Sequence, residues 1–272
     1  MLKFTVLMSV YYKEDPKYLD ESFKSLSVQT FQSNEIILVI DGEIPNELLT
    51  VINKWIQLLP IVTIPLEKNV GLGQALNIGL KHATNNIVAR MDTDDVCVPD
   101  RFEKQIKYFE NNSDTIILGG AIEEYNESLD KALGRRFSCV SNNEIIDYSV
   151  KRNPFNHMTV MFNKEFILDV GGYHHHLYME DYNLWLRCIA RGAICHNLND
   201  TLVLVRAGDK MIERRRGWTY AKSEFKLASL KFKCIPDKKL QIAIISILRI
   251  FSRILPIKML STIYKILRRF GS

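Results

Sequence analysis

Strand-like and helix-like segments alternate along the N-terminal part of the chain, and this alternation constrains the fold more than any other feature of the sequence. Short connections between such segments favour right-handed crossovers and a mostly parallel sheet covered by helices. The sequence therefore predicts an α/β fold. The strand-like runs lie within residues 3–12, 34–43, 61–69 and 86–92, and the helix-like segments within 14–30, 46–59 and 72–84.

Local signals mark where several helices begin. Asp15 is a suitable N-cap for the first helix, and Pro16 suits its first helical position. The later predicted elements are a helix within 99–112, a strand within 114–120, a loosely patterned region over 121–157 and, after Gly171-Gly172, a helix opened by Glu180 and Asp181.

Composition places the chain among globular proteins with a large core. Its 272 residues are 47% hydrophobic, which is enough for one long domain or one domain with an appendage. The five cysteines form no CxxC pair, which favours buried thiols in a reducing compartment over disulfides or zinc ligands. The apolar start is followed at once by charged residues and lacks a small-residue cleavage site, so it predicts a strand and not a signal peptide. We therefore expect a cytoplasmic location.

Basic residues are concentrated at the C-terminal end. The net charge is +5, yet residues 238–272 contain eight of the 36 Lys and Arg and no acidic residue. The rest of the chain is therefore net negative. Nucleic-acid-binding proteins usually spread basic groups over the folded body, with aromatic side chains between them. No nucleic-acid partner is expected, and the tail is expected to have a partner of its own.

An acidic cluster, Asp92, Asp94 and Asp95, directly follows a strand-like run, and Asp41 follows an earlier one. Ligands of parallel sheets bind beyond the carboxyl ends of the strands. Carboxylates this close repel one another unless a cation or substrate compensates them, and their oxygens suit Mg²⁺ or Mn²⁺, which can bridge a diphosphate. The alternative is a solvated acidic turn in which Asp95 or Asp100 caps the next helix, and the DxD spacing alone does not exclude it.

Four segments together have the order and character of one enzyme family. They are residues 6–31, 35–43, 69–105 with its NxGxxxxxN and DxD patterns, and 171–192 with the run MEDYNLW. The set resembles family 2 glycosyltransferases of the bacterial polysaccharide and O-antigen type, over roughly residues 3–220. The resemblance implies a GT-A fold, a nucleotide-sugar donor and inversion at the anomeric carbon. It implies a GT-A domain over 1–220, with a donor half over about 1–120 and an acceptor half over about 121–220. The residues after it, 221–272, are expected to form a basic amphipathic helical tail.

The resemblance implies a donor site at the ends of the first strands. Asp41 corresponds to the acidic residue that contacts the base or ribose, although it also suits a turn. Asp92 and Asp94 correspond to the pair that holds the metal, Mn²⁺ or Mg²⁺, on the diphosphate, whose charge grows as the sugar leaves. Gly71 and Gly73 also suit a simple turn and helix start. The implied donor-binding residues are Ser9, Tyr11, Asp41, Asn69, Gly71, Asn77, Arg90, Asp92, Asp94 and Arg206.

The resemblance also implies an acceptor side. Asp181 corresponds to the second residue of the family's ED motif and is expected to be the general base that deprotonates the acceptor hydroxyl, with Glu180 in support. Acids at the start of a helix also stabilise its dipole, so their placement has a second explanation. His157 and Asp95 are the expected acceptor-binding residues, although a lone histidine is equally common as a packing residue.

Two further runs are less informative. His174 to His176 are expected to form a polar loop at the acceptor mouth, because three adjacent rings rarely reach one ion. The basic segment 208–218 resembles one that faces diphosphate oxygens in this subgroup, but Arg214 to Arg216 are equally a solvated charge run. No histidine follows His196, so the late histidine ligand of metal-dependent relatives is missing and the third protein ligand stays open.

The expected activity is transfer of a hexose, glucose or galactose, from a UDP-sugar to a sugar on a polyprenyl diphosphate, through a β-1,3 bond, in surface polysaccharide assembly. The nearest alternative enzyme is a metal-dependent nucleotidyltransferase, but residues 9–19 lack the Gly-rich phosphate loop of that class. A catalytically inactive, membrane-associated scaffold is the alternative from another class, and the intact carboxylates argue against it.

The tail is expected to bind a membrane surface. Residues 240–255 predict a helix with one polar arc, and 258–270 predict a second basic helix. With two arginines in 16 residues, the first helix is not expected to span a bilayer. The pair is expected to lie on anionic lipid at the inner face of the cell membrane, and packing on the catalytic domain is the alternative. The polar arc consists of Gln241, Ser246, Arg249, Ser252 and Arg253.

Overall fold

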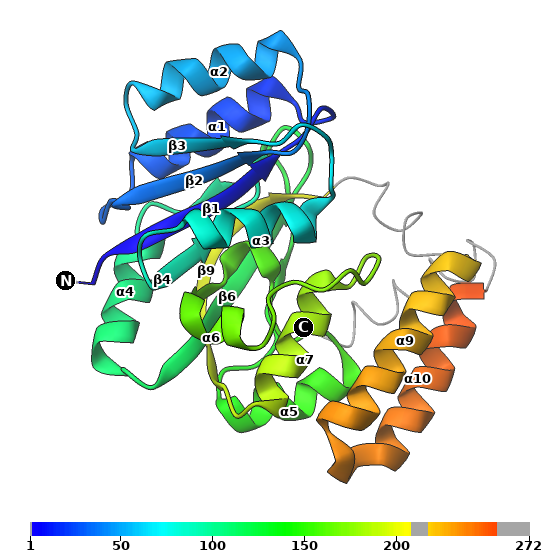
Figure 1. Cartoon of the computed structure of the whole chain (residues 1–272). Helices are drawn as coiled ribbons and strands as arrows, with labels where there is room; N and C mark the ends of the chain where they lie inside the picture. Colours follow the sequence, from blue (N-terminus) through cyan, green and yellow to red (C-terminus); the bar gives the residue numbers. More distant parts are fainter. Residues whose placement is uncertain (1, 208–216, 255–272) are drawn as a thin grey trace.

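Nine strands form one sheet in the part of the chain that the computed structural model describes, residues 2–207 and 217–254 (Figure 1). The strands are β1 (Phe4–Val10), β2 (Glu35–Ile40), β3 (Ile61–Pro65), β4 (Ile87–Arg90), β5 (Val96–Cys97), β6 (Thr115–Tyr125), β7 (Ala132–Arg136), β8 (Met161–Asn163) and β9 (Ile194–Arg206). The helices are α1 (Pro16–Ser27), α2 (Asn46–Ile56), α3 (Leu72–His82), α4 (Arg101–Asn111), α5 (Asn142–Lys151), α6 (Lys164–Asp169), α7 (Glu180–Ala190), α9 (Trp218–Cys234) and α10 (Lys239–Ile254), with short 3-10 helices η1 (His157–Thr159) and η2 (Pro236–Lys238).

The first four strands are parallel and end at the same edge of the sheet. The sheet order is β3-β2-β1-β4-β8-β6-β9-β5, and β7 pairs with β6. β1 is parallel to β2 and β4, and β2 is parallel to β3. β8 runs antiparallel to both β4 and β6, whereas β6 and β9 are parallel. The predicted α/β fold with a mostly parallel sheet is confirmed, and the segments that follow β1, β2 and β4 emerge side by side.

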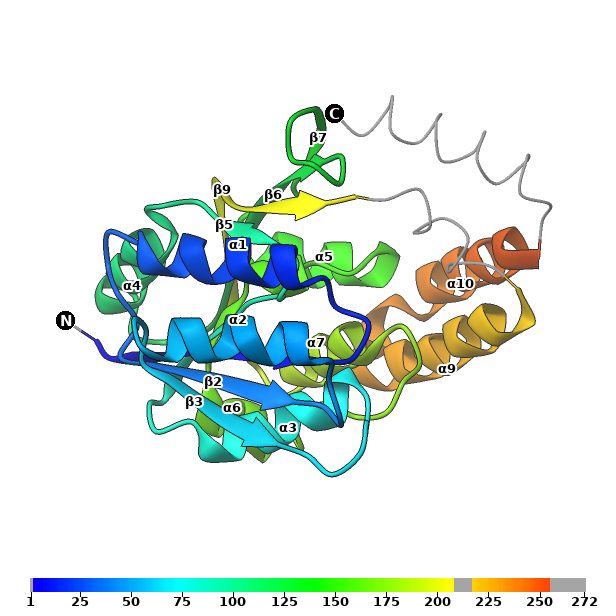
Figure 2. The same cartoon turned by 90° about the horizontal axis from the view of Figure 1, so that it is seen from above.

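Helices cover both faces of the sheet, as Figure 2 shows from above. β1 explains why, because successive side chains of a strand point to opposite faces. Val6 and Met8 join the core beneath α1, α2 and α4, whereas Leu7 joins the core beneath α3. Each fully buried aliphatic side chain contributes about 1.5–3 kcal/mol to stability. The central strands are therefore held from both sides, and this holds the loops at their carboxyl ends.

The predicted helix starts are confirmed where local chemistry determined them. The Asp15 carboxylate accepts a hydrogen bond from the Lys17 backbone N–H at 2.8 Å, with Pro16 at the first helical position of α1. Glu180 begins α7. The loosely patterned region contains the end of β6, the strand β7 and α5. Its pattern is weak because β7 is fully exposed and lacks alternating buried positions.

α9 and α10 form a helical hairpin that packs against the sheet domain through α5 and α7 (Figures 1 and 2). The helix predicted over 240–255 is confirmed as α10. α9 lies almost wholly within the helical tail expected over 221–272, although no separate helix was predicted there. Val150, Tyr182, Leu227 and Ile242 are among the side chains of a separate small core at this junction. No described helix combines the length and the apolar character that crossing a membrane requires. The second predicted tail helix, over 258–270, lies outside the described residues.

Candidate active site

The end of β2 is tied to the loop that begins α3. Both carboxylate oxygens of Asp41 accept backbone hydrogen bonds, from Val70 N at 2.7 Å and from Gly71 N at 3.1 Å. The Asn69 amide donates to the Asp41 carbonyl oxygen at 3.1 Å. Asp41 is buried, and each of its oxygens keeps a further lone pair. Three predicted donor residues, Asp41, Asn69 and Gly71, therefore form one connected unit beside the end of β1. Ser9 lies near the end of that strand and Tyr11 directly follows it.

The acidic cluster lies directly after β4. Asp92, Asp94 and Asp95 each bring a carboxylate oxygen within 4.8 Å of the others. Burial, and next the charge of Asp92, raise the pKa of Asp94 to about 6, and burial with the charge of Asp94 raises the pKa of Asp95. Burial is the larger cause of both shifts, and the neighbouring carboxylates add to it. The oxygen-only donor set and its excess negative charge fit a hard divalent ion such as Mn²⁺ or Mg²⁺.

Glu14, in the loop between β1 and α1, adds a fourth carboxylate to this region. Burial, and then the charges of Asp94 and Asp92, raise its pKa to about 7, and its side chain is hydrogen-bonded to Thr93. This residue was not predicted from the sequence. Its only sequence signal was its place in the loop after the first strand. With Asp95, it increases the number of carboxylates near the proposed metal ligands.

Two arginines fix the backbone and orientation of the acidic cluster. Arg90 is 1% exposed, and its guanidinium pairs with the Asp92 carboxylate while also donating to the backbone oxygens of Leu7 and Met91. Arg206, at the end of β9, donates to the Asp94 backbone oxygen and pairs with Glu21. Its guanidinium carbon lies over the ring of Tyr18, 4.1 Å from the ring centre. Both side chains therefore support the cluster from the protein side.

The start of α3 lies against the start of α7, so segments about 100 residues apart form one wall. Asn77 makes two hydrogen bonds of 2.7 Å to the backbone of Tyr173, one to its N–H and one to its oxygen. Gly172, with φ +63, has to be glycine here because a Cβ would lie 2.4 Å from the Asn77 Oδ1. A Cβ on Gly73 would lie 3.3 Å from the Cγ of Glu180. The predicted donor segment and the ED motif are therefore neighbours.

Asp181 is held at the first turn of α7 by two donors. Its Oδ1 accepts the Tyr182 backbone N–H at 2.7 Å, and its Oδ2 accepts the Asn153 side-chain amide at 2.6 Å. Both carboxyl groups of the ED motif are half-buried, and burial raises the pKa of Glu180. The roles of general base and of acid at a helix start are compatible for Asp181, since a carboxylate that accepts two hydrogen bonds keeps lone pairs for a substrate. Asn153 was missed from sequence because a lone Asn before Pro154 signals only a turn.

His157 is close enough to both Asp92 of the acidic cluster and Asp181 of the ED motif to be affected by their charges. Its Nε2 is 2.9 Å from the Tyr173 hydroxyl, and its ring meets the edge of Trp185. Burial, with the charge of Arg90, lowers the pKa of His157 to about 4, and the charges of Asp181 and Asp92 act in the opposite direction. The imidazole is therefore neutral near pH 7, and it can exchange hydrogen bonds but cannot serve as a cation.

The histidine run forms a loop, as expected, but one ring is structural. His174 and His175 are exposed, whereas His176 is buried, with its Nε2 2.9 Å from the Ser223 backbone oxygen of α9. No described cluster of possible metal ligands includes these rings, since the single one found is the acidic cluster. Arg214 to Arg216 lie outside the described residues.

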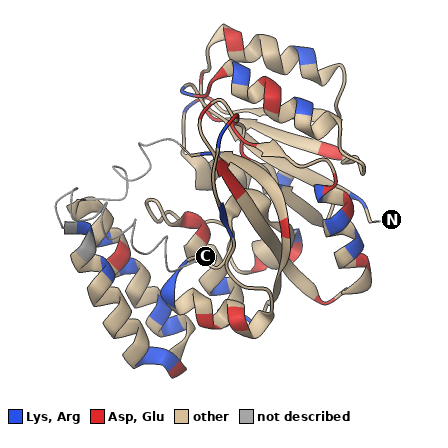
Figure 3. Cartoon of the chain, turned by 180° about the vertical axis from the view of Figure 1, so that it is seen from behind, with Lys and Arg blue, Asp and Glu red and all other residues tan. Residues whose placement is uncertain are grey.

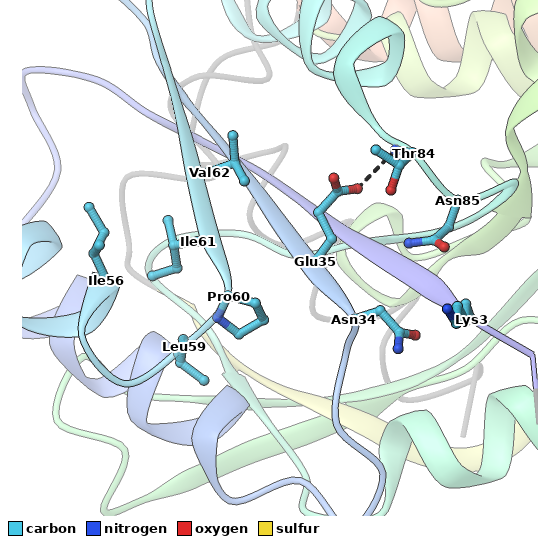
Figure 4. Close-up of a pocket in the computed structure, with 10 residues that line it drawn as sticks. All are labelled: Lys3, Asn34, Glu35, Ile56, Leu59, Pro60, Ile61, Val62, Thr84 and Asn85. Carbon is cyan, nitrogen blue, oxygen red and sulfur yellow. Dashed lines mark hydrogen bonds between the residues drawn. The ribbon is translucent and has the colours of Figure 1, made fainter.

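A hollow of about 470 Å³ lies at the opposite edge of the sheet, near Lys3, Glu35 and Asn85 (Figure 4). The Glu35 carboxylate there is already engaged, with Thr84 N at 2.9 Å and Thr5 Oγ1 at 2.6 Å. This edge holds the amino ends of the parallel strands, whereas ligands of such sheets bind at the carboxyl ends. The hollow is therefore not the candidate active site.

Comparison with known proteins identifies the family. The sequence profile of Glycosyl transferase family 2 matches residues 5–180, which include the acidic cluster and the first residue of the ED motif. The chain belongs to this family. It is therefore a glycosyltransferase, as the resemblance implied, and the alternative of a nucleotidyltransferase is not supported.

Similar family 2 members span nearly the whole chain. The Amylovoran biosynthesis glycosyltransferase AmsE of Erwinia amylovora is 45% identical over 262 residues, covering 96% of this chain and 98% of that protein. The UDP-Gal:alpha-D-GlcNAc-diphosphoundecaprenol beta-1,3-galactosyltransferase of Escherichia coli is 40% identical over 271 residues, covering 98% of each.

Solved structures confirm the GT-A fold. S. aureus TarS 1–349 in complex with UDP-GlcNAc aligns with a TM-score of 0.72 at 19% identity, over 93% of this chain and 74% of that one. The mannosyltransferase PcManGT from Pyrobaculum calidifontis, in complex with GDP-Man and Mn²⁺, aligns with a TM-score of 0.65 at 15% identity, over 97% of this chain and 80% of that one.

Proposed function

We propose that this protein transfers galactose from UDP-galactose, with inversion, to a GlcNAc residue on polyprenyl diphosphate, forming a β-1,3 bond during surface polysaccharide assembly. The reaction takes place at the inner face of the cell membrane. The acidic cluster at the carboxyl edge of the sheet is the observation that carries this proposal, because it fits a metal-bound diphosphate. The choice of galactose is supported by the activity for which the Escherichia coli relative is named.

The donor side of the site works by position and charge. Ser9, Tyr11 and the Asp41 unit line the end of the parallel strands and bind the nucleoside, while Asp92 and Asp94 would hold Mn²⁺ or Mg²⁺. When bound, the ion stabilises the negative charge of the departing UDP. Arg90 keeps the Asp92 carboxylate in one orientation, and Arg206 does the same for the backbone at Asp94. Preorganised groups of this kind do not have to reorient as charge develops.

The acceptor side requires a separate carboxylate. Inversion needs the attacking hydroxyl on the face of the sugar opposite the diphosphate. Asp181, at the start of α7, is not part of the acidic cluster that contains Asp92 and Asp94. Asp181 takes the hydroxyl proton as the new glycosidic bond forms. Glu180 supports the start of α7, and His157 and Asp95 contact the acceptor sugar. The neutral imidazole of His157 suits an uncharged hydroxyl partner.

A paired donor assay tests the proposed function. The full chain, with Mn²⁺ and a lipid-diphosphate-linked GlcNAc acceptor, is supplied with UDP-galactose or UDP-glucose. We expect UDP-galactose to react about tenfold faster or more, because the wrong hydroxyl orientation leaves polar groups of the site unpaired. NMR of the product should show a β-1,3 bond. An α-linked product, or no transfer from either donor, contradicts the proposal.

Asn153 is expected to be a positioning residue for the base. Asn153→Ala removes one of the two donors that hold Asp181, so kcat should fall about tenfold, the equivalent of one hydrogen bond. The KM for the donor sugar should stay unchanged.

Asn126→Ala is the matched control for Asn153, since its amide holds the exposed carboxylate of Asp130 in the β6–β7 turn. A purely structural role for Asn153 would lower the melting temperature and change the KM for the donor sugar as well as kcat, which would contradict positioning.

A further inference from the structure

The C-terminal hairpin presents a large apolar surface outward. On α10, the exposed side chains recur at helical spacing, with Leu240 76%, Ile247 66%, Leu248 64% and Phe251 64% exposed. On α9, Phe225 is 65% exposed, and Trp218 and Phe232 lie on the same line of the helix, seven residues before and after it. Single exposed apolar residues are ordinary, but a contiguous patch on two neighbouring helices indicates a binding surface.

Arg249 and Arg253 of α10 face the protein, as does the fully buried Ile242. Glu224 of α9 is 3% exposed and accepts hydrogen bonds from Arg249 at 2.8 Å and from Arg253 at 3.1 Å. Arg253 also lies over the ring of Tyr220 at 4.8 Å. Rolling α10 to bury its apolar side would leave the Glu224 charge buried and unpaired, which is strongly unfavourable. The outward direction of the apolar side is therefore fixed by buried ion pairs, the reverse of an ordinary surface helix.

The charges around this surface favour an anionic lipid partner. Lys222, Lys226 and Lys233 of α9 are exposed, and they lie beside the line of aromatic side chains. The only acidic residue of α9 and α10 is the buried Glu224. Figure 3 shows the blue lysine and arginine bands of the hairpin. Aromatic and aliphatic side chains bordered by lysine are the composition of helices that lie in a membrane interface.

We propose that the outer face of the α9–α10 hairpin inserts into the interfacial region of a bilayer that contains anionic lipid. The face is defined by Phe225, Leu240, Ile244, Ile247, Leu248 and Phe251. Its biological purpose rests on the proposed function, since the acceptor is proposed to be lipid-linked. The binding itself does not depend on catalysis, so the two ideas can fail separately.

The hairpin is attached to the segment that carries the proposed base. Ser223 of α9 donates to the Leu177 backbone oxygen at 2.6 Å, and Lys231 lies 4.7 Å from the ring centre of Tyr182, the neighbour of Asp181. Lys231 is buried and donates to the Val150 oxygen at 2.9 Å. Insertion of the hairpin would therefore hold the start of α7 at a set distance from the lipid surface, where a diphosphate-linked sugar is presented.

Vesicle flotation of the full chain tests this docking surface. We expect wild-type protein to bind phosphatidylglycerol–phosphatidylcholine vesicles and the double variant Leu248→Ser/Phe251→Ser to bind at least tenfold more weakly. Leu58→Ser is the matched control, because Leu58 is 66% exposed in the connection between α2 and β3 and should have no effect. A large part of the binding should survive 0.5 M NaCl, since insertion is apolar. Melting temperatures verify that all variants are folded.

Tryptophan fluorescence gives an independent readout. Of the three tryptophans, Trp55 and Trp185 are buried and Trp218 is 70% exposed, so a blue shift on adding vesicles reports Trp218. Trp218→Phe should remove the shift. Unchanged vesicle binding by the double variant overturns the proposal. A wild-type dimer that dissociates in the double variant also overturns it, because a second copy of the chain would then cover the outer face of the hairpin. Vesicle binding without sugar transfer by the wild type would instead overturn the proposed function alone.

Discussion

We expect Asp94→Ala to abolish sugar transfer, with a loss of about a hundredfold or more. Asp94 and Asp92 are the residues proposed to hold the metal, and each has an oxygen close enough to share one ion. Removing one carboxylate removes the charge that keeps the ion on the departing diphosphate, and losing one stabilising group of this kind typically costs that much. UDP binding, measured by calorimetry, should weaken strongly in Mn²⁺ and little in EDTA.

The acidic cluster also predicts how metal binding depends on pH. Because the pKa of Asp94 is raised to about 6 and that of Glu14 to about 7, both groups take up protons as the pH falls from 8 to 5. Protons and the ion compete for the same oxygens, so Mn²⁺ affinity should decrease over this range and binding should release protons.

Asp100→Ala is the control for Asp94→Ala. Asp100 is a nearby acidic side chain that pairs with Lys104 at 2.8 Å in a partly exposed bridge, so its loss should cost little. Full-rate transfer by wild-type protein in EDTA would show that the metal assignment is wrong, whatever the variants do.

The parts of the fold that were predictable are those that local sequence determines. β1 to β4 alternate with α1 to α3 because apolar spacing changes from runs to helical periods within a few residues, and Asp15 caps α1 through a bond to a residue two positions away. The position of Asp41 and Asp92 at one sheet edge followed from parallel strand order. All of these inferences use neighbours in sequence or one general rule of sheet geometry.

The contacts that complete the site were not predictable in this way. Asn153 reaches Asp181 across 28 positions, and Asn77 reaches Tyr173 across 96. Spacing identifies a polar residue but not the distant group with which it forms a hydrogen bond. The same limit applies to α10. Spacing placed its two arginines on one arc, but the direction of that arc depends on their pairing with Glu224 of α9, 25 and 29 positions away.

We expect Asp181→Asn to reduce kcat by about a hundredfold or more, as the loss of acid–base catalysis does. Asparagine keeps the size of the side chain and an oxygen for the Tyr182 N–H, but it cannot take the acceptor proton. Its amide nitrogen would face the Asn153 amide, so a melting curve should accompany the assay. UDP and Mn²⁺ affinities should barely change, because Asp181 is proposed to contact the acceptor and not the nucleotide or the metal.

Asp169→Asn provides the comparison for Asp181→Asn, since Asp169 is 63% exposed and pairs only loosely with Arg191 at 3.5 Å. Its turnover should match wild type. Three outcomes for Asp181→Asn are then distinct. A large fall in kcat with intact UDP binding supports the base. Near-normal turnover makes Glu180, which lies beside Gly73 of α3, the next candidate. Loss of UDP binding as severe as that of Asp94→Ala would mean that the start of α7 helps to hold the donor. The assignment of Asp181 to the acceptor would then be wrong.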